Sequence, residues 1–460
     1  MKTIIRILPA FFLFLALSFT VRQDDEAALL RRAEKLHDRI ISIDTHTDTA
    51  LDLIKPDADL SKVQASFPRL REGRVDCCFY PVFVDQGPLD EETEARVYDE
   101  TLTKMKAIRA YIEARPKEAA IALTAKDIAR NKKRHRLSLV MGLENAYPIG
   151  RDLSRLQAFY DLGTRIITLS HNYDNDVCDA SRYPQNTWGG LSPFGKDLVR
   201  EMNRLGVIVD CSHASTATLY DCLALSTAPV ICSHSCVYAI KDHPRNLTDD
   251  EIRAIAAKGG VIQVTTGRWA LSWLPHAEVN VGTFCDHVEY IRNLVGVEYV
   301  GIGTDFDGGG GMNGLEDASK MKDKERKKPS SSRPMRFVTD GGYEVLVGRN
   351  NMQNDRLTMK EAERFDWFFH VKNAPGSHVI MISRGDEPPA EDFTQAARLA
   401  AYYSSKRDGE NVEVDYTQVR NIKKPANSAP GFVIYSQNYS AVVTPDADEA
   451  ARLRTDKDRK

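Results

Sequence analysis

Residues 206–213 read Gly-Val-Ile-Val-Asp-Cys-Ser-His, a short apolar run that ends in side chains able to bind a metal ion or move a proton. Seven further apolar runs of this kind lie along the chain, and most of them also end in such side chains. They occupy residues 41–43, 75–84, 137–143, 165–169, 229–231, 260–265 and 299–303. Strands that deliver reactive side chains at one end are typical of a (β/α)8 barrel, whose chemistry collects at the C-terminal ends of its strands.

Amphipathic helical patterns precede or separate these runs. They cover residues 25–39, 91–113, 153–162, 193–205, 214–225 and 249–258. The last pattern has clear boundaries, because Thr248 and Glu251 have the spacing of a capping box and Gly259-Gly260 stops the helix. The alternation predicts a parallel α/β fold, a TIM-type barrel over residues 25–319.

The alternation stops after Asp317, before the helix that should cover the eighth strand. Residues 320–335 are charged and rich in proline and serine, which indicates a linker. Beyond the linker, short alternating segments at 343–347, 378–382 and 431–435 accompany one helical pattern at 392–403. We therefore expect a barrel that lacks its usual C-terminal segment, a small α+β domain at 336–447, and a charged tail at 448–460.

The first 21 residues have the composition of an export signal. Lys2 and Arg6 precede a largely apolar run of 15 residues at 7–21. Because a bilayer needs roughly 20 apolar residues, we expect a cleaved signal and no stable transmembrane span. Export to the periplasm or the exterior follows, and an uncleaved signal that anchors the protein in the membrane is the alternative.

The charge of the chain limits its partners. The formal net charge of −3 argues against a protein that is basic throughout, so any nucleic-acid binding would have to be local.

Candidate metal ligands stand at several predicted strand ends. His46 and Asp48 point to the same side of the first strand, because strand side chains alternate. Other strand ends carry Glu144, His213, His234 and Asp305. Imidazole and carboxylate are the ligands of hydrolytic zinc, and Glu144 could give one oxygen to each of two ions. A hydroxide bridging the two metals would be the nucleophile, and Asp305 would pass a proton to the leaving amine.

Eight segments of the barrel region carry specific motifs. They are Asp44-Thr-His-Thr-Asp48, Gly142-Leu-Glu-Asn-Ala146, Leu169-Ser-His-Asn172, Pro193-Phe-Gly-Lys196, Ile208-Val-Asp-Cys-Ser-His213, Pro229-Val-Ile-Cys-Ser-His-Ser235, His243-Pro-Arg-Asn246 and Gly301-Ile-Gly-Thr-Asp-Phe-Asp-Gly308. By these motifs the region resembles the membrane (renal-type) dipeptidases, zinc metallopeptidases of the amidohydrolase superfamily.

The resemblance assigns a role to each candidate residue. It implies that His46, Asp48 and Glu144 hold one zinc ion, and that Glu144, His213 and His234 hold the other. It places His171 near the scissile carbonyl and Asp305 at the amine. Arg245 would bind the carboxylate of a dipeptide through a bidentate fork.

The C-terminal region carries a second set of motifs. They include Asp340-Gly-Gly-Tyr343, the segments 347–358 and 369–379, Val414-Asp-Tyr-Thr417 and Lys423-Lys-Pro425. By these motifs, residues 336–447 resemble the RNA-binding domain of NFACT, or fibronectin-binding-like, proteins, with Phe368 where that family usually has tryptophan. The resemblance implies contact with RNA or the ribosome. The basic side chains available for phosphates are Arg349, His370, Lys372, His378, Lys423 and Lys424.

The two resemblances imply different compartments, since an exported peptidase meets no ribosome. We expect zinc-dependent hydrolysis of dipeptides. One alternative is an RNA- or ribosome-binding protein of the NFACT type with an inactive barrel. Another is a different amidohydrolase reaction, on cyclic amides or deaminated rings, which a carboxylate-binding Arg245 would disfavour. A homodimer is a candidate assembly.

Overall fold

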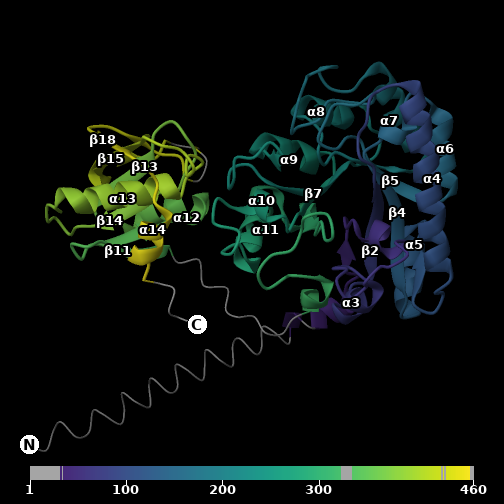
Figure 1. The fold of residues 1–460 in the computed structure, drawn as a ribbon, viewed down its shortest axis with the longest axis horizontal. Helices are drawn as coiled ribbons and strands as arrows, with labels where there is room; N and C mark the ends of the chain where they lie inside the picture. Colours follow the sequence, from purple (N-terminus) through teal and green to yellow (C-terminus); the bar gives the residue numbers. More distant parts are fainter. Residues whose placement is uncertain (1–31, 34, 323–333, 426–427, 429–430, 456–460) are drawn as a thin grey trace, which may run out of the picture.

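A computed structural model of the chain describes residues 32–33, 35–322, 334–425, 428 and 431–455. It contains an α/β unit followed along the chain by an α+β unit (Figure 1). The export signal expected at 1–21 and most of the expected linker lie outside the described residues. In the part of the chain that is described, no helix is long and apolar enough to cross a membrane.

The first unit is a nearly closed barrel of eight parallel strands in the order β1-β2-β4-β5-β6-β7-β9-β10. They are β1 (Ile43–Asp44), β2 (Cys77–Phe83), β4 (Leu137–Glu144), β5 (Thr164–Thr168), β6 (Ile208–Asp210), β7 (Ile231–Val237), β9 (Val261–Val264) and β10 (Val300–Ile302). The first and last strands meet where the Thr45 amide donates to the Ile302 carbonyl at 3.2 Å. The barrel predicted from the eight apolar runs is thereby confirmed.

Helices cover the outside of the barrel. They include α4 (Glu91–Glu113), α6 (Leu153–Asp161), α7 (Pro193–Leu205), α8 (Thr216–Leu225), α9 (Asp249–Ala257) and α11 (Val281–Val295). The capping box predicted for α9 is present, since Thr248 and Glu251 exchange side-chain and backbone hydrogen bonds. Gly206 ends α7 with φ 77°, a left-handed conformation that glycine adopts without strain.

The sequence patterns missed several elements of the barrel, among them two short strands and helix α11. β3 (Ala119–Ile121) and β8 (Asn246–Leu247) are short additions that pair with β4 and β7. Helix α11 begins with a capping box made by Asn280 and Thr283, which departs from the Ser/Thr and Glu/Gln pattern. These elements escaped prediction because their local signals are short or atypical.

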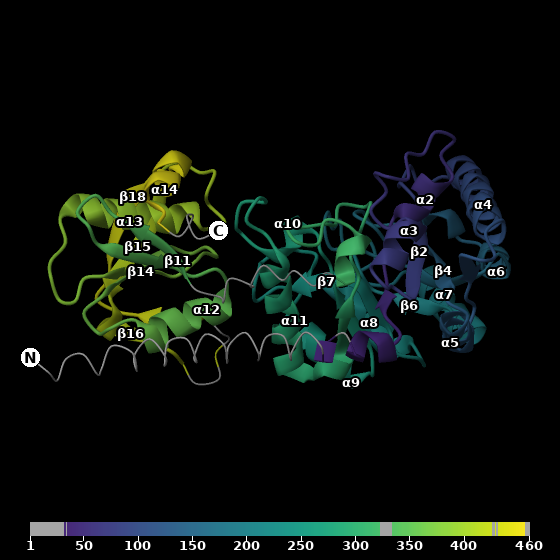
Figure 2. The same cartoon turned by 90° about the horizontal axis from the view of Figure 1, so that it is seen from below.

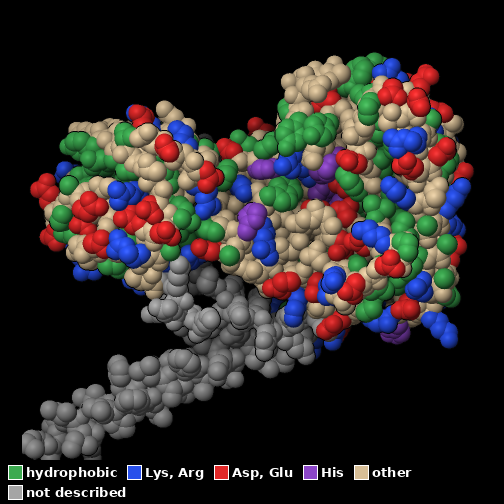
Figure 3. Space-filling model, in the orientation of Figure 1, with side chains coloured by type: hydrophobic (Ala, Val, Ile, Leu, Met, Phe, Trp, Pro, Cys, Tyr) green, Lys and Arg blue, Asp and Glu red, His purple; other side chains and the backbone are tan. Residues whose placement is uncertain are grey.

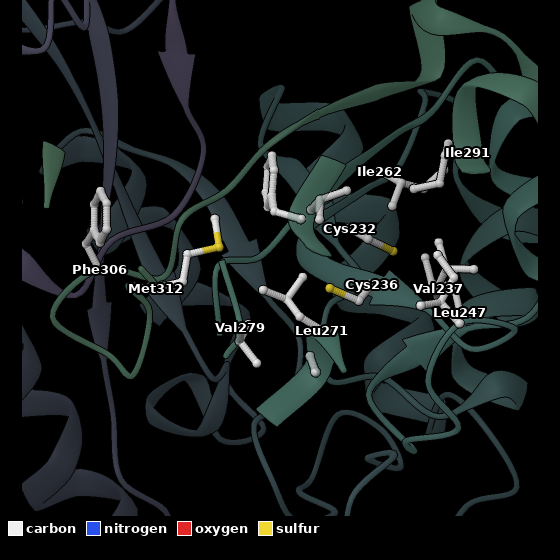
Figure 4. Close-up of a cluster of buried hydrophobic side chains, with 14 of the residues drawn as sticks. Cys232, Cys236, Val237, Leu247, Ile262, Leu271, Val279, Ile291, Phe306 and Met312 are labelled. Carbon is white, nitrogen blue, oxygen red and sulfur yellow. The ribbon is translucent and has the colours of Figure 1, made fainter. Parts of the chain in front are cut away.

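The barrel core contains aliphatic, aromatic, methionine and cysteine side chains. Figure 4 shows part of it, where Cys232 of β7 lies near Ile262 of β9 and Cys236 of β7 lies near Leu271 of α10. All eight cysteines are free thiols, and seven of them are buried. They pack as small apolar residues and form no framework of disulfides.

No long helix follows β10 within residues 303–322. A short 3-10 helix, η3 (Ala318–Lys322), packs instead on α3 (Phe67–Glu72), and the Ala318 amide donates to the Gln64 carbonyl at 3.0 Å. The helix before the last strand, α11, contacts β7, β9 and β10.

The second unit is a six-stranded antiparallel sheet with helix α13 (Ala390–Tyr402) packed against it. The strand order is β11-β12-β14-β13-β15-β18, with β11 (Met335–Val338), β12 (Glu344–Val347), β13 (Trp367–Val371), β14 (Val379–Ile382), β15 (Val412–Gln418) and β18 (Tyr439–Val443). The smaller elements are α12 (Asn351–Arg356), β16 (Ile422–Lys423), β17 (Ile434–Tyr435) and α14 (Ala447–Leu453). This unit approaches the barrel beside α10 (Arg268–Leu271) and α11 (Figures 1 and 2).

Candidate metal centre

The candidate ligands converge at the C-terminal ends of the barrel strands. His46 and Asp48 follow β1, Glu144 ends β4, His213 follows β6, and His234 lies in β7. The Glu144 carboxylate lies between the imidazoles, because its Oε2 is 3.4 Å from His46 Nε2 and its Oε1 is 3.3 Å from His213 Nε2. His234 Nε2 is 3.5 Å from the same Oε1. One carboxylate therefore faces both groups of candidate ligands.

Unusual backbone conformations aim two of the site residues. His213 and Asp305 have φ angles of 68° and 61°. Residues other than glycine rarely adopt this left-handed conformation, and it concentrates at functional sites. The Asp305 amide donates to the His46 carbonyl at 2.9 Å, which holds the turn after β10 against the turn after β1.

Burial and charge perturb every ionisable group of the centre. Burial, together with Glu144, raises the pKa of Asp48 well above its usual range. Burial would raise the pKa of Glu144 as well, but the neighbouring imidazoles hold it well below its usual range. Burial raises the pKa of Asp305 to about 7. Three buried carboxylates therefore crowd one small volume, and a cation would relieve their repulsion.

The imidazoles respond to the same surroundings. Burial by itself would lower the pKa of His46, but Glu144 and the other carboxylates raise it to about 10. Burial lowers the pKa of His213 and of His234 well below the usual value for histidine.

The residues present fit a metal ion. Nε2 of His213 and Nε2 of His234 approach to 2.9 Å, and His46 Nε2 and Asp48 Oδ1 are buried without a hydrogen-bond partner. Ligand atoms within 4.8 Å of one another group His46 with Asp48 and Asp305, and Glu144 with His171 and His213. Buried unpaired polar atoms are costly, and bound cations would give these atoms partners.

Two further predicted residues border the centre. Arg245 is 3% exposed, its Nη2 donates to the His234 carbonyl at 3.4 Å, and its Nη1 has no hydrogen-bond partner. Burial lowers the pKa of Arg245 to about 10. The His171 ring lies 4.3 Å from the His213 ring, centre to centre, and 4.8 Å from the Phe83 ring. A buried guanidinium with an unpaired nitrogen is suited to receive a carboxylate.

Comparison with known proteins agrees with this geometry. The model of the membrane dipeptidase family, peptidase family M19, matches residues 30–324. The chain belongs to the membrane dipeptidase family. It is 36% identical over 271 residues to an uncharacterized dipeptidase of Schizosaccharomyces pombe, covering 56% of this chain and 66% of that protein. It is 33% identical over 265 residues to dipeptidase aclJ of Aspergillus oryzae, covering 56% and 63%.

Solved structures support the same assignment. The probable dipeptidase PvdM of Pseudomonas aeruginosa superposes with a TM-score of 0.56 at 27% identity, covering 64% of this chain and 91% of that one. The chain spans slightly less than two thirds of the length of the two curated relatives. A model of the NFACT protein RNA binding domain matches residues 333–435.

A cavity of about 440 Å³ lies beside the metal centre of this dipeptidase-family barrel. Its lining includes Trp269, Arg268, Gln64 and the glycines 309–311. A Cβ atom added to Gly309 would lie 3.8 Å from Trp269 Nε1 and 3.9 Å from an Asp305 oxygen, so this wall borders Asp305. The Arg245 guanidinium lies 5.6 Å from the centre of the Trp269 ring. The sequence patterns missed Trp269, because it lies in a short helix away from the strand-end motifs.

The predicted phosphate contacts of the second unit are not all on its surface. His378 is 2% exposed, burial lowers its pKa to about 3, and its ring packs edge-on against Phe368. Burial also lowers the pKa of His370. His378 is therefore buried, whereas His370 is half-buried, and phosphate contact at these two positions stays a prediction.

The other four predicted contacts are basic side chains at or near the surface. Lys423 is exposed, Lys424 pairs with Asp355, and Lys372 lies 3.4 Å from Glu413. Arg349 is half-buried. On the face shown in Figure 3, acidic and basic side chains are interspersed over the second unit.

Proposed function

We propose that the protein is an exported, zinc-dependent dipeptidase. The observation that carries this proposal is the convergence of His46, Asp48, Glu144, His213 and His234 on one buried volume, with Arg245 Nη1 unpaired beside it. Two zinc ions held there, with Glu144 between them, would supply Lewis acidity and a hydroxide nucleophile at neutral pH.

The remaining side chains would bind and orient the dipeptide. Arg245 would pair with its C-terminal carboxylate, and His171 would donate to the carbonyl of the scissile bond. Asp305 would accept a proton from the attacking water and pass it to the leaving amine. A carboxyl group whose pKa is raised to about 7 is suited to both steps near neutral pH.

Hydrolysis of dipeptides by the purified chain tests the proposal. Turnover should require zinc, disappear on chelation and return when zinc is restored. Asp305→Asn should bind zinc normally and lose at least about 10²-fold in kcat, as expected for removal of a general acid-base group. A soluble protein that holds two zinc ions and cleaves no dipeptide would refute the proposal.

Arg245 separates dipeptides from other amide substrates. Arg245→Lys keeps the charge but loses the planar fork, so kcat/KM for dipeptides should fall markedly. Cyclic amides without a carboxylate would be unaffected by the change. A preference for such amides in the unaltered protein would favour another amidohydrolase reaction.

The family match of residues 333–435 supports a second candidate function, RNA binding by the C-terminal unit. Binding of single-stranded RNA at several salt concentrations tests it, because phosphate contacts make affinity fall steeply with salt. Lys423→Glu should weaken binding. Lys372→Glu tests a second predicted phosphate contact and should weaken binding as well. Absence of salt-sensitive binding would contradict this function.

A further inference from the structure

A buried polar pair lies directly behind the candidate ligands. Asp210 ends β6, Ser233 lies in β7 next to His234, and both are fully buried. Asp210 lies near His46 and His234, close enough to be grouped with them as a potential ligand. Its hydrogen bonds indicate that it positions neighbouring side chains and does not bind a metal ion.

The Asp210 carboxylate has four donors around it. Oδ1 accepts from the backbone amides of Ser212 and Ser233, at 3.0 and 2.9 Å. Oδ2 accepts from the hydroxyls of Thr168 and Ser233, both at 2.6 Å. Its acceptor positions are therefore used, and it has none left to offer to a metal ion.

Ser233 transmits this arrangement to two histidines. Its single proton goes to Asp210, so its oxygen can only accept from other groups. Nδ1 of His234 lies 2.8 Å from that oxygen, and Nδ1 of His46 lies 3.4 Å from it. His234 must then carry its proton on Nδ1, which leaves the lone pair on Nε2. His46 must do the same once it gives up its second proton to bind a metal ion.

We propose that Asp210 and Ser233 are positioning residues that fix the tautomer of His46 and His234, so that both rings present an unprotonated Nε2 to the metal centre. One hydroxyl would thereby orient a ligand from each half of the proposed two-metal site. The effect that we expect on zinc binding rests on the proposed function. The tautomer of His234 itself can be observed without metal.

Asp210→Asn is the most direct test, because asparagine keeps the shape of aspartate but replaces the hydrogen-bond acceptor Oδ2 by an NH2 donor. The two backbone amides can only donate, so they retain the amide oxygen of the new Asn. Its NH2 group then faces Ser233 and donates to it. The Ser233 proton then turns away from residue 210. Because His234 Nδ1 at 2.8 Å is a closer acceptor than Ser212 Oγ at 3.4 Å, the His234 ring proton moves to Nε2. A similar reversal of histidine tautomer by an isosteric Asp→Asn change costs serine proteases about 10⁴-fold in kcat.

Long-range ¹H–¹⁵N correlation spectra of the metal-free protein read the tautomers directly. The unaltered chain should show protonated Nδ1 and unprotonated Nε2 on His234, and Asp210→Asn should move the His234 proton to Nε2. Zinc affinity, measured by competition with a chromophoric chelator, should fall about 10- to 100-fold in Ser233→Ala, as for other outer partners of ligands. Asp210→Asn should lose at least as much.

Two variants control for simple loss of packing. Ser235→Ala removes a buried hydroxyl from the same strand whose oxygen is 3.5 Å from Ser212 and contacts no ligand ring. Thr168→Val removes a donor to Asp210 but leaves Ser233 in place. Both should keep zinc affinity within about 3-fold of the unaltered chain, below the effect expected for a partner of a ligand.

The possible outcomes separate this inference from the proposed function. If Asp210→Asn does not fold, Ser233→Ala decides, and unchanged zinc affinity in it overturns the inference. Protonated Nε2 on His234 of the unaltered, metal-free chain also overturns it. If the unaltered chain shows the expected tautomers but binds no zinc, the inference stands and the proposed function fails.

Discussion

Asp305 and Asp307 both follow β10, but their carboxylates have different partners. Asp305 is buried beside the candidate ligands, whereas Asp307 accepts from the backbone amides of Gln64 and Ala65. The Gln64 side chain in turn accepts from the Asp307 amide and donates to the Gly310 carbonyl. Asp307 therefore holds the glycine-rich loop at residues 308–311 in place. The Asp305 carboxylate remains available for proton transfer.

Gly308 is the residue of this loop where a side chain would meet both Asp48 and Asp305. An added Cβ would lie 1.7 Å from Asp48 Oδ2 and 2.7 Å from Asp305 Oδ1. Gly308→Ala should displace the Asp48 carboxylate and weaken zinc binding by at least about 10-fold, comparable with disturbing a partner of a ligand. Gly301→Ala is the matched control, since its Cβ would meet the flexible Gln263 side chain at 3.2 Å. Equal zinc affinities of the two variants would contradict the prediction.

Helix α11 is tied to the barrel by one buried histidine. The Val237 amide of β7 donates to Nδ1 of His287 at 3.0 Å, so Nε2 carries the proton and donates to the Leu271 carbonyl at 2.8 Å. Burial lowers the pKa of His287 to about 4. This is a satisfied core histidine, and it joins α11, β7 and α10 in the region beside the cavity.

The lowered pKa of His287 predicts that acid weakens the stability of the folded protein. The folded pKa lies below the unfolded value of 6.5, so the contribution to stability is complete above pH 6.5 and is lost as pH falls toward 4. The loss should reach about 3 kcal/mol for this group. His287→Gln should be less stable at pH 7.5, because Val237 loses its acceptor, but it should lose less stability on acidification.

Urea unfolding at pH 7.5 and 4.5 measures this difference. His135→Gln, a change at an exposed histidine, is the control and should have the same pH dependence as the unaltered chain. If His287→Gln and His135→Gln lose equal stability between the two pH values, the assignment of the neutral, buried form is wrong.

At the scale of the whole molecule, polar contacts between described residues join the two units. Arg454 lies 2.6 Å from Glu278, Arg407 donates to the Trp273 carbonyl at 3.2 Å, and Asn350 donates to Asp286 at 2.5 Å. Glu278 and Trp273 belong to the segment between α10 and α11 that also carries His276 of the cavity lining. The C-terminal unit therefore contacts a segment that lines the cavity beside the candidate metal centre.

Removing two of these contacts should uncouple the units. In the double variant Arg407→Ala/Arg454→Ala we expect the barrel and the C-terminal unit to unfold in separate calorimetric transitions, with the interface weakened by about 1–3 kcal/mol. Arg452→Ala is the control, since Arg452 pairs with Asp340 and Glu449 inside the C-terminal unit. A double variant that unfolds like this control would show that these arginines do not hold the interface.

The sequence by itself determined the barrel, the order of its main elements and the set of candidate ligands. Strand and helix patterns depend on neighbours a few residues apart, so apolar runs and caps such as Thr248 report them directly. His46, Glu144 and His234 could be singled out because a parallel barrel brings all strand ends to one face. The family motifs then gave each residue an expected role.

The tertiary structure decided what each of these residues touches. Ser233 reaches His46 across 187 positions of sequence, and Arg407 reaches Trp273 across 134. His378 could have faced either side of its sheet, and its burial against Phe368 settled the side. Periodicity tells which face of an element is apolar, but hydrogen-bond polarity and burial depend on partners that only the closed barrel and the packed sheet bring together.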